Sequence, residues 1–188
     1  MPPADSDPET NLEGFRDYLR LLARLQIPHR LRAKVDESDL VQLTLATAWE
    51  KWEQFRGANE ATLAAWLRQI LANQLAGAYR QYAAERRDVA RERSLEAAVE
   101  QSSARLEAWL VADHSTPSQH TQRQEELLRL AHALAKLPAA ERDAVELHHL
   151  QGCSLGETAA LMGRTKPAVM GLLFRGLKRL RRILEGSA

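Results

Sequence analysis

Residues 153–184, CSLGETAALMGRTKPAVMGLLFRGLKRLRRIL, predict two successive helices joined by a short turn. Ser154 with Glu157 three positions later predicts a capping box, in which each residue satisfies a free backbone N–H of the other at the start of a short helix. Gly163 predicts a turn with positive φ after that helix, because glycine has no Cβ to oppose this conformation. Ala159 is small enough to lie where two helices cross closely. The core-facing side chains of the short helix are expected to be Leu155 and either Leu161 or Met162.

A second helix is predicted to begin at Thr165, with Pro167 in its first turn, where a missing N–H costs little. Its expected core stripe recurs every three or four residues, at Val169, Leu173, Gly176 or Leu177, and Leu180. The opposite side is basic and free of acids, with Arg164, Lys166, Arg175, Lys178, Arg179, Arg181 and Arg182. The alternative is an ordinary helical hairpin. The agreement of caps, small residue, turn glycine and one-sided basic face favours a helix-turn-helix, whose second helix reaches base edges in DNA.

The formal net charge of +1 hides an uneven distribution along the chain. Residues 1–11 carry −3, residues 12–93 carry +3, residues 94–126 carry −4 and residues 127–188 carry +5. Two basic blocks therefore flank an acidic middle. Basic blocks of this kind suit a phosphate-rich partner, although a solvated helix face gives the same signal.

Apolar residues recur at three- and four-residue steps nearly everywhere, and strand-like alternation is absent. The sequence therefore predicts an all-α fold of two small helical domains joined by a flexible linker. We expect a disordered N-terminus over 1–11, a first domain over 12–93, a linker over 94–124 and a helix-turn-helix domain over 125–188.

The first domain is predicted to contain three helices. One runs from about Leu12 to Gln26, and a third runs from about Ala61 to Ala83. The second begins at the acidic run 36–39, which can cap free amides. Its expected buried seam is Val41, Leu45, Ala48, Trp52 and Phe55. The spacing of Trp49, Trp52 and Trp66 favours core packing over base stacking.

Several classes of protein are disfavoured by the composition. The single cysteine, Cys153, excludes an internal disulfide and a CxxC metal site and fits a reducing cytoplasm. No run of apolar residues is long enough for membrane insertion, and the N-terminus is acidic. We expect no metal, no cofactor and no catalytic residue, because phosphate loops, nucleophile elbows and paired carboxylates are missing. His148 and His149 have no further ligand at metal spacing.

Several motifs of the chain resemble the extracytoplasmic-function group of the sigma-70 family, the smallest sigma factors, which keep domains two and four. The run DLVQ at 39–42 with Ala48-Trp49, and the run FRG at 55–57 with Ala65-Trp66-Leu67, resemble the family's domain two. Leu137-Pro138 and residues 152–180 resemble domain four. The resemblance implies an alternative sigma factor that binds core RNA polymerase and promoter DNA. It implies no catalytic chemistry.

The resemblance also implies roles for individual residues of domain two. A polymerase-binding surface would consist of Asp36, Asp39, Leu40, Gln42 and Leu43. Asn73 would capture a flipped base of the minus-ten element. The single-stranded backbone would be followed by Arg80, Arg86, Arg87 and Arg91.

In domain four, the resemblance implies contacts to the minus-thirty-five element from Arg164, Thr165, Lys166, Met170, Gly171 and Arg175. It implies phosphate contacts from Lys178, Arg179 and Arg182. The family's polar run TVKSRLHR reads AVMGLLFR at 168–175, so three polar readers are replaced by Met170, Gly171 and Leu172. Base readout is then weak or shape-based, or these residues together with Phe174 contact a protein.

Two other functions compete with the sigma factor. A conventional helix-turn-helix regulator would bind a palindromic duplex without polymerase, and a helical adaptor would not bind DNA at all. Regulation has two candidate partners, an anti-sigma factor or a Ser/Thr kinase. A kinase would act on the linker residues Ser102, Ser103, Ser115, Thr116, Ser118 and Thr121.

Overall fold

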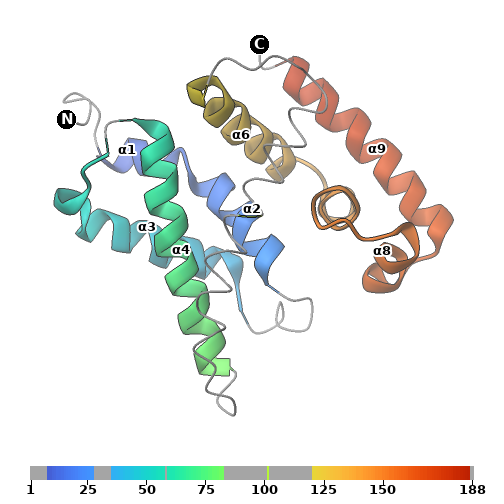
Figure 1. The fold of residues 1–188 in the computed structure, drawn as a ribbon. Coiled ribbons are helices and arrows are strands. Elements are labelled where there is room, and N and C mark those ends of the chain that lie inside the picture. Colours follow the sequence, from blue (N-terminus) through green and yellow to red (C-terminus); the bar gives the residue numbers. More distant parts are fainter. Residues whose placement is uncertain (1–7, 28–34, 58, 83–100, 102–119, 187–188) are drawn as a thin grey trace. The chain divides into compact units, whose positions relative to one another are not determined.

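The computed structural model describes residues 8–27, 35–57, 59–82, 101 and 120–186. The chain forms two compact units, residues 1–128 and residues 129–188. Every regular element in the described part is a helix (Figure 1), which confirms the all-α fold class. The predicted linker over 94–124 lies largely outside the described residues.

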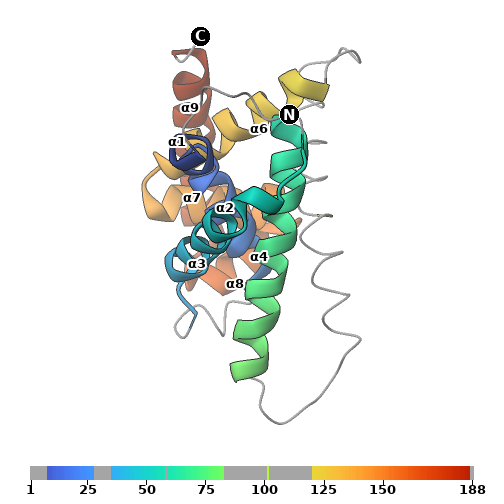
Figure 2. The ribbon, with the colours of Figure 1, turned by 90° about the vertical axis from the view of Figure 1, so that its left-hand side faces the viewer.

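The first unit is built from α1 (Pro8–Glu13), α2 (Arg16–Gln26), α3 (Glu37–Glu50), the 3-10 helix η2 (Trp52–Gln54) and α4 (Glu60–Tyr82). Helices α2, α3 and α4 pack on one another around a shared core (Figure 2). Their most deeply buried side chains are Tyr18, Leu19, Leu22, Val41, Ala48, Leu67 and Leu71.

The N-terminal segment differs from the prediction. Residues 8–11 were expected to be disordered, but α1 begins at Pro8, which suits a first helical position because its missing N–H would be unpaired there. The predicted helix from Leu12 to Gln26 is interrupted at Gly14, a poor helix former. Arg16 bridges the break, since its Nη2 donates to Glu13 Oε2 at 2.7 Å.

Polar contacts join the helices of the first unit. Arg68 Nη1 donates to the Tyr18 hydroxyl at 3.2 Å, and the Tyr79 hydroxyl donates to the carbonyl oxygen of Gln26 at 2.7 Å. Gln74 Nε2 of α4 donates to Thr47 Oγ1 of α3 at 3.1 Å. These bonds fix how α4 crosses the other two helices.

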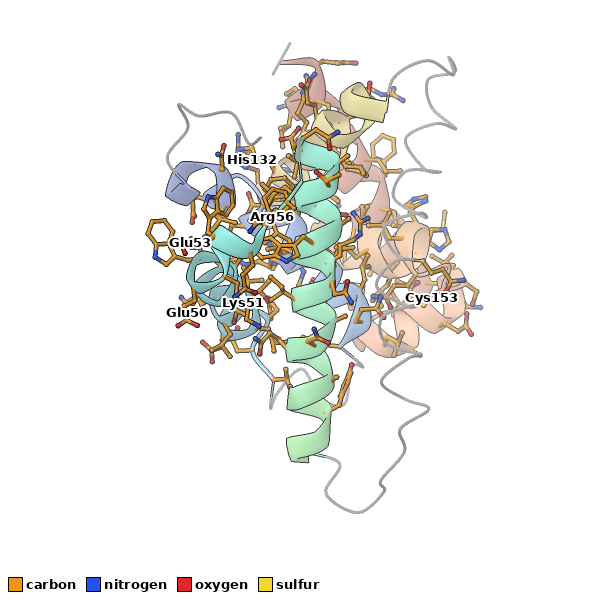
Figure 3. All side chains as sticks on the ribbon, turned by 60° about the vertical axis from the view of Figure 1, so that its left-hand side comes forward. Glu50, Lys51, Glu53, Arg56, His132 and Cys153 are labelled. Atoms are coloured by element: carbon orange, nitrogen blue, oxygen red, sulfur yellow. The ribbon has the colours of Figure 1, made fainter. Side chains whose placement is uncertain are left out.

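Helix α3 starts as predicted, because the Asp36 side chain caps it by accepting from the Ser38 N–H at 2.7 Å. It ends at Glu50, and the chain continues through η2 to Phe55. Arg56 then donates to the carbonyl oxygens of Glu53 and Phe55 as the chain leaves η2 (Figure 3).

The tryptophans do not behave alike. Trp52 and Trp66 are half-buried and form a cluster with Phe55, with ring centroids 5.1–6.4 Å apart. Trp49 is 51% exposed, so its predicted place in the core was wrong. Trp49 precedes the end of α3 and lies at the edge of the buried Val41–Leu45–Ala48 stripe, one turn after Leu45.

The second unit contains the end of α6 (His120–Ala135), then α7 (Ala139–Val145), the π-helical turn η3 (Glu146–Leu150), α8 (Leu155–Met162) and α9 (Lys166–Glu185). Helix α6 begins at His120, so residues 120–124 are helical and not linker. The core of the unit consists of Leu130, Leu134, Leu137, Ala144, Val145, Leu147, Leu150, Val169, Leu172, Leu173 and Leu180.

Candidate nucleic-acid interface

The turn between α8 and α9 forms as the sequence predicts. The Ser154 N–H donates to Glu157 Oε2 at 2.8 Å, and the Glu157 N–H donates to Ser154 Oγ at 3.3 Å, which completes the capping box. Gly163 ends α8 with φ of 60°. Thr165 then caps α9 by accepting from the Ala168 N–H at 3.4 Å. These local bonds fix where α9 starts relative to α8.

Helix α9 is held against the rest of the second unit by one apolar stripe. Val169 is fully buried and Leu180 is 3% exposed. Gly176 is also buried, and a Cβ there would lie 3.3 Å from the carbonyl oxygen of Glu141 in α7. The prediction left two core positions open. At the first, Gly176 is more buried than Leu177, and at the second, Met162 of α8 is more buried than Leu161.

The opposite face of α9 is open to solvent and basic. Of the predicted DNA-binding residues, the exposed ones are Arg164, Thr165, Lys166, Met170, Arg175, Lys178, Arg179 and Arg182, while Gly171 is half-buried. Within the described part of the chain, five of the exposed cations form no ion pair: Arg164, Lys166, Lys178, Arg181 and Arg182. An outer face with free positive charge is what phosphate contacts require.

Two arginines of α9 are ion-paired with a residue that the sequence interpretation did not assign to the interface. Arg175 Nε lies 3.5 Å from Glu141 Oε1, and Arg179 Nε lies 2.9 Å from Glu141 Oε2. The Glu141 side chain is only 7% exposed, whereas the two arginine side chains are 56% and 53% exposed. In the sequence, the only indication of this pairing was that Glu141 is an acidic residue at an inward-facing position of α7.

The same face carries large apolar side chains. Phe174 is 71% exposed and Met170 is 58% exposed. They are four residues apart, so they lie on neighbouring turns of one side of α9. Met170 and Phe174 therefore alter the outer surface of this helix, whereas Leu172, also at a position where the family has a polar residue, is 7% exposed and belongs to the core.

In the first unit, α3 presents most of the predicted polymerase-binding residues on one side. Asp36, Asp39 and Gln42 are exposed, and Leu43 is 54% exposed. The predicted place of Leu40 on this surface was wrong, because Leu40 is 5% exposed and belongs to the core of the unit. A side chain buried against its own unit supports the surface but is not available to a partner.

Trp49 extends this side of α3 beyond the predicted residues. It lines a groove of about 360 Å³ between α1 and α3, together with Leu12, Glu13, Arg16, Gln42, Leu45 and Ala46. Trp49 is exposed, and aromatic side chains are enriched at protein–protein interfaces. The steps of three and four residues from Gln42 and Leu43 to Ala46 and Trp49 could have revealed this second stripe in the sequence.

Of the predicted minus-ten contacts, Asn73 is exposed on α4. Its neighbour Gln74 is bonded to Thr47, which fixes the rotation of α4 at that level. Arg80 belongs to the last turn of α4, but its side chain lies outside the described residues, as do Arg86, Arg87 and Arg91.

Three described side chains of the second unit have shifted pKa values. Burial, and then the nearby Glu157 carboxylate, raise the pKa of the Cys153 thiol. Hydrogen bonding to the Ser154 side chain, and then to its backbone N–H, lowers the pKa of Glu157 below its ordinary value. Burial, and then the neighbouring His148, lower the pKa of His149. His148 Nδ1 lies 2.7 Å from the carbonyl oxygen of Cys153, a contact that joins η3 to the residue before the Ser154 cap of α8.

Among the described residues, no group of three or more His, Cys, Asp or Glu side chains could hold a metal ion. No helix in this part of the chain is both long and apolar enough to cross a membrane.

Comparison with protein families gives two matches, one in each unit. The model "Sigma-70 region 2" matches residues 15–87, and the model "Sigma-70, region 4" matches residues 127–180. The second match covers the whole of the α8–α9 turn and α9 as far as Leu180.

Curated relatives match most of the chain. An RNA polymerase sigma-E factor from Streptomyces antibioticus is 31% identical over 151 residues, which is 80% of this chain and 72% of the relative. The sigma factor CnrH from Cupriavidus metallidurans is 28% identical over 156 residues, which is 82% of this chain and 76% of the relative.

Two solved structures are also similar. The sigma factor RpoE of Bartonella quintana, solved with the anti-sigma factor NepR, is 26% identical with a TM-score of 0.36, over 94% of this chain and 96% of that one. CnrH, solved with the cytosolic domain of CnrY, is 25% identical with a TM-score of 0.35, over 94% of this chain and 84% of that one. With region 2 and region 4 in its two units and a relative at 31% identity, the chain belongs to the extracytoplasmic-function group of the sigma-70 family, and it is an alternative sigma factor that directs RNA polymerase to promoters.

Proposed function

We propose that the chain divides promoter recognition between its two units. The outer side of α3 binds core RNA polymerase, Asn73 of α4 takes up a base of the minus-ten element, and the outer face of α9 meets the minus-thirty-five element. The observation that carries the proposal is the α8–α9 geometry, in which caps and a glycine turn present a face with five cations that form no ion pair with any described residue. The chain is proposed to act in the cytoplasm, as a specificity subunit with no reaction of its own.

The polymerase-binding surface is proposed to run along α3 through Asp39, Gln42, Leu43 and Trp49. The carboxylate and the amide surround two exposed apolar side chains, the arrangement expected of a protein interface with a polar rim. Truncating a hot-spot residue at the centre of such an interface costs about 2 kcal/mol or more. Leu43 is the best test site, because it is exposed and its replacement leaves the core of the unit intact.

The test is a pull-down of core RNA polymerase by the full-length chain carrying Leu43→Arg. We expect binding to weaken by about 30-fold, which corresponds to about 2 kcal/mol. Ala65→Arg is the matched control, because it adds the same charge at an exposed position of α4. Unchanged binding by Leu43→Arg, or equal loss with both variants, would contradict the assigned surface. Leu40→Arg is not informative, since a charge at a buried position unfolds the unit.

At the minus-ten element, an exposed amide on a helix held in place by a neighbouring bond fits the role given to Asn73. Its amide can donate to and accept from the Watson–Crick edge of an extruded base. The proposed contacts of Arg80, Arg86, Arg87 and Arg91 with the single strand, and regulation by an anti-sigma factor or a kinase, remain predictions from the sequence.

A further inference from the structure

We propose that Glu141 is a positioning residue for promoter recognition, which holds the guanidinium groups of Arg175 and Arg179 so that their terminal nitrogens face the DNA. Two glycines of α9, Gly171 and Gly176, make this arrangement possible. The inference rests on the proposed function of α9 as the helix that meets the minus-thirty-five element.

The first support is the way in which the ion pairs form. Glu141 approaches both arginines at Nε, at 3.5 Å for Arg175 and 2.9 Å for Arg179, and the shorter contact approaches off the N–H direction. Because Glu141 contacts Nε, the two Nη groups at the far end of each guanidinium are left for other contacts. Because both arginine side chains are more than half exposed, those ends remain available on the outer face of α9.

The second support is the close approach of α7 and α9 at Gly176. A Cβ at this position would lie 3.1 Å from Val145 Cγ2 and 3.4 Å from Glu141 Cβ. Any larger residue would push α9 away from α7, and with it Arg175 and Arg179 from the carboxylate. Gly176 therefore sets the spacing at which one acid reaches two arginines on successive turns.

The third support is the space beside Gly171. A Cβ there would lie 3.3 Å from Arg175 Nη1, which is shorter than an ordinary van der Waals contact. The guanidinium of Arg175 thus lies across the position where residue 171 would carry its side chain. This explains a glycine inside a long helix, where glycine is otherwise unfavourable, at a position where the family has a polar reader.

The physical consequence is preorganisation. An arginine that is free in solution loses rotamer freedom when it contacts a base or phosphate, whereas an arginine already held at Nε loses less. End-on contact through two Nη groups still allows the planar, bidentate recognition of guanine or phosphate oxygens. With the polar readers at 170–172 replaced, orientation of Arg175 becomes the main source of base discrimination on this helix.

The experiment uses holoenzyme reconstituted from core polymerase and the full-length chain. The probe is a pool of promoter duplexes randomised over the minus-thirty-five segment, and the measured preference is the enrichment of the best sequence over the median one. We expect wild type to show a preference of at least about five-fold, the equivalent of one good base contact. Glu141→Gln should lower this preference by about two- to five-fold, while the holoenzyme stays assembled.

A double-mutant cycle separates positioning from a general structural role. In an Arg175→Ala background, Glu141→Gln should have little further effect, because the residue through which Glu141 acts is gone. Asp143→Asn is the control, since Asp143 is half-buried in the same helix and, within the described part of the chain, forms no ion pair with α9. Full preference in Glu141→Gln, or an equal loss with and without Arg175, overturns the inference.

The outcomes also distinguish this inference from the proposed function. If the wild-type holoenzyme enriches no sequence over the randomised segment, the role of α9 at the minus-thirty-five element is wrong. If wild type enriches a sequence and Glu141→Gln enriches it equally well, only the positioning role is wrong. Should Glu141→Gln fail to fold, Gly171→Ala disturbs the same guanidinium without altering α7, and unchanged preference in that variant overturns the inference.

Discussion

Gly171 is a residue at which stability and recognition should move in opposite directions. Alanine is favoured over glycine in a helix by about 1 kcal/mol, so Gly171→Ala should raise the stability of α9 by about 0.5–1 kcal/mol. The added Cβ would meet Arg175 Nη1 at 3.3 Å and displace the guanidinium. We therefore expect a higher unfolding temperature together with a two- to five-fold lower preference at the minus-thirty-five segment, about 0.4–1 kcal/mol.

Gly77 of α4 is the matched control for this substitution. A Cβ at Gly77 meets no atom within 4 Å, so Gly77→Ala should raise helix stability without changing preference at the minus-thirty-five segment. If Gly171→Ala raises stability and leaves preference at the wild-type level, the space beside Gly171 has no part in orienting Arg175.

Single residues were predicted less well than the helices that carry them. Leu40 and Leu43 both lie beside the Val41–Leu45 stripe, and the sequence does not say which of them faces the core. Packing of α3 against α2 and α4 decides it, burying Leu40 and leaving Leu43 exposed. Glu141 was missed for a related reason, since its partners are more than thirty residues away in the chain.

At the scale of the element, the α8–α9 turn could be predicted almost completely. Its determinants are local: a capping box within four residues, a positive-φ glycine and a threonine cap. The start of α1 and the end of α3 could not, because they depend on which side chains the neighbouring helices cover. Where a helix is fixed by bonds between near neighbours, sequence is sufficient, and where it is fixed by packing it is not.

The capping box of α8 should make that helix sensitive to acid. Because the folded pKa of Glu157 lies below its ordinary value of 4.5, the unfolded chain binds the proton first as the pH falls. The contribution of this carboxylate is therefore complete above the unfolded pKa and is lost as the pH drops through the folded pKa. Glu157→Gln should be less stable than wild type at pH 7, and this difference should vanish toward pH 3.

Hydrogen exchange at the amides of α8 measures this effect in the full-length chain. Ser154→Ala provides the comparison, because losing the serine cap should cost about 1 kcal/mol at any pH. A gap between wild type and Glu157→Gln that stays constant from pH 7 to pH 3 would show that the charge of Glu157 does not contribute to the cap.

At the scale of the whole molecule, each unit has its own core and its own outward surfaces. The first unit offers the α3 surface and Asn73, and the second offers the outer face of α9. The residues proposed for polymerase binding and minus-ten recognition lie in the first unit, and those proposed for minus-thirty-five recognition lie in the second. Polymerase binding, minus-ten recognition and minus-thirty-five recognition should therefore respond to separate substitutions.

Asn73→Ala and Glu141→Gln test this separation directly. Asn73→Ala removes the amide that meets the flipped base, so promoter opening should weaken by about 1–3 kcal/mol while preference at the minus-thirty-five segment stays at the wild-type level. Glu141→Gln should lower the preference at the minus-thirty-five segment and leave promoter opening nearly unchanged. Since the two side chains share no partner, their free-energy effects on open-complex formation should add within about 0.5 kcal/mol in the double variant. Permanganate reactivity of the melted strand measures promoter opening. A coupling free energy well above about 0.5 kcal/mol would mean that the two units do not recognise the promoter independently.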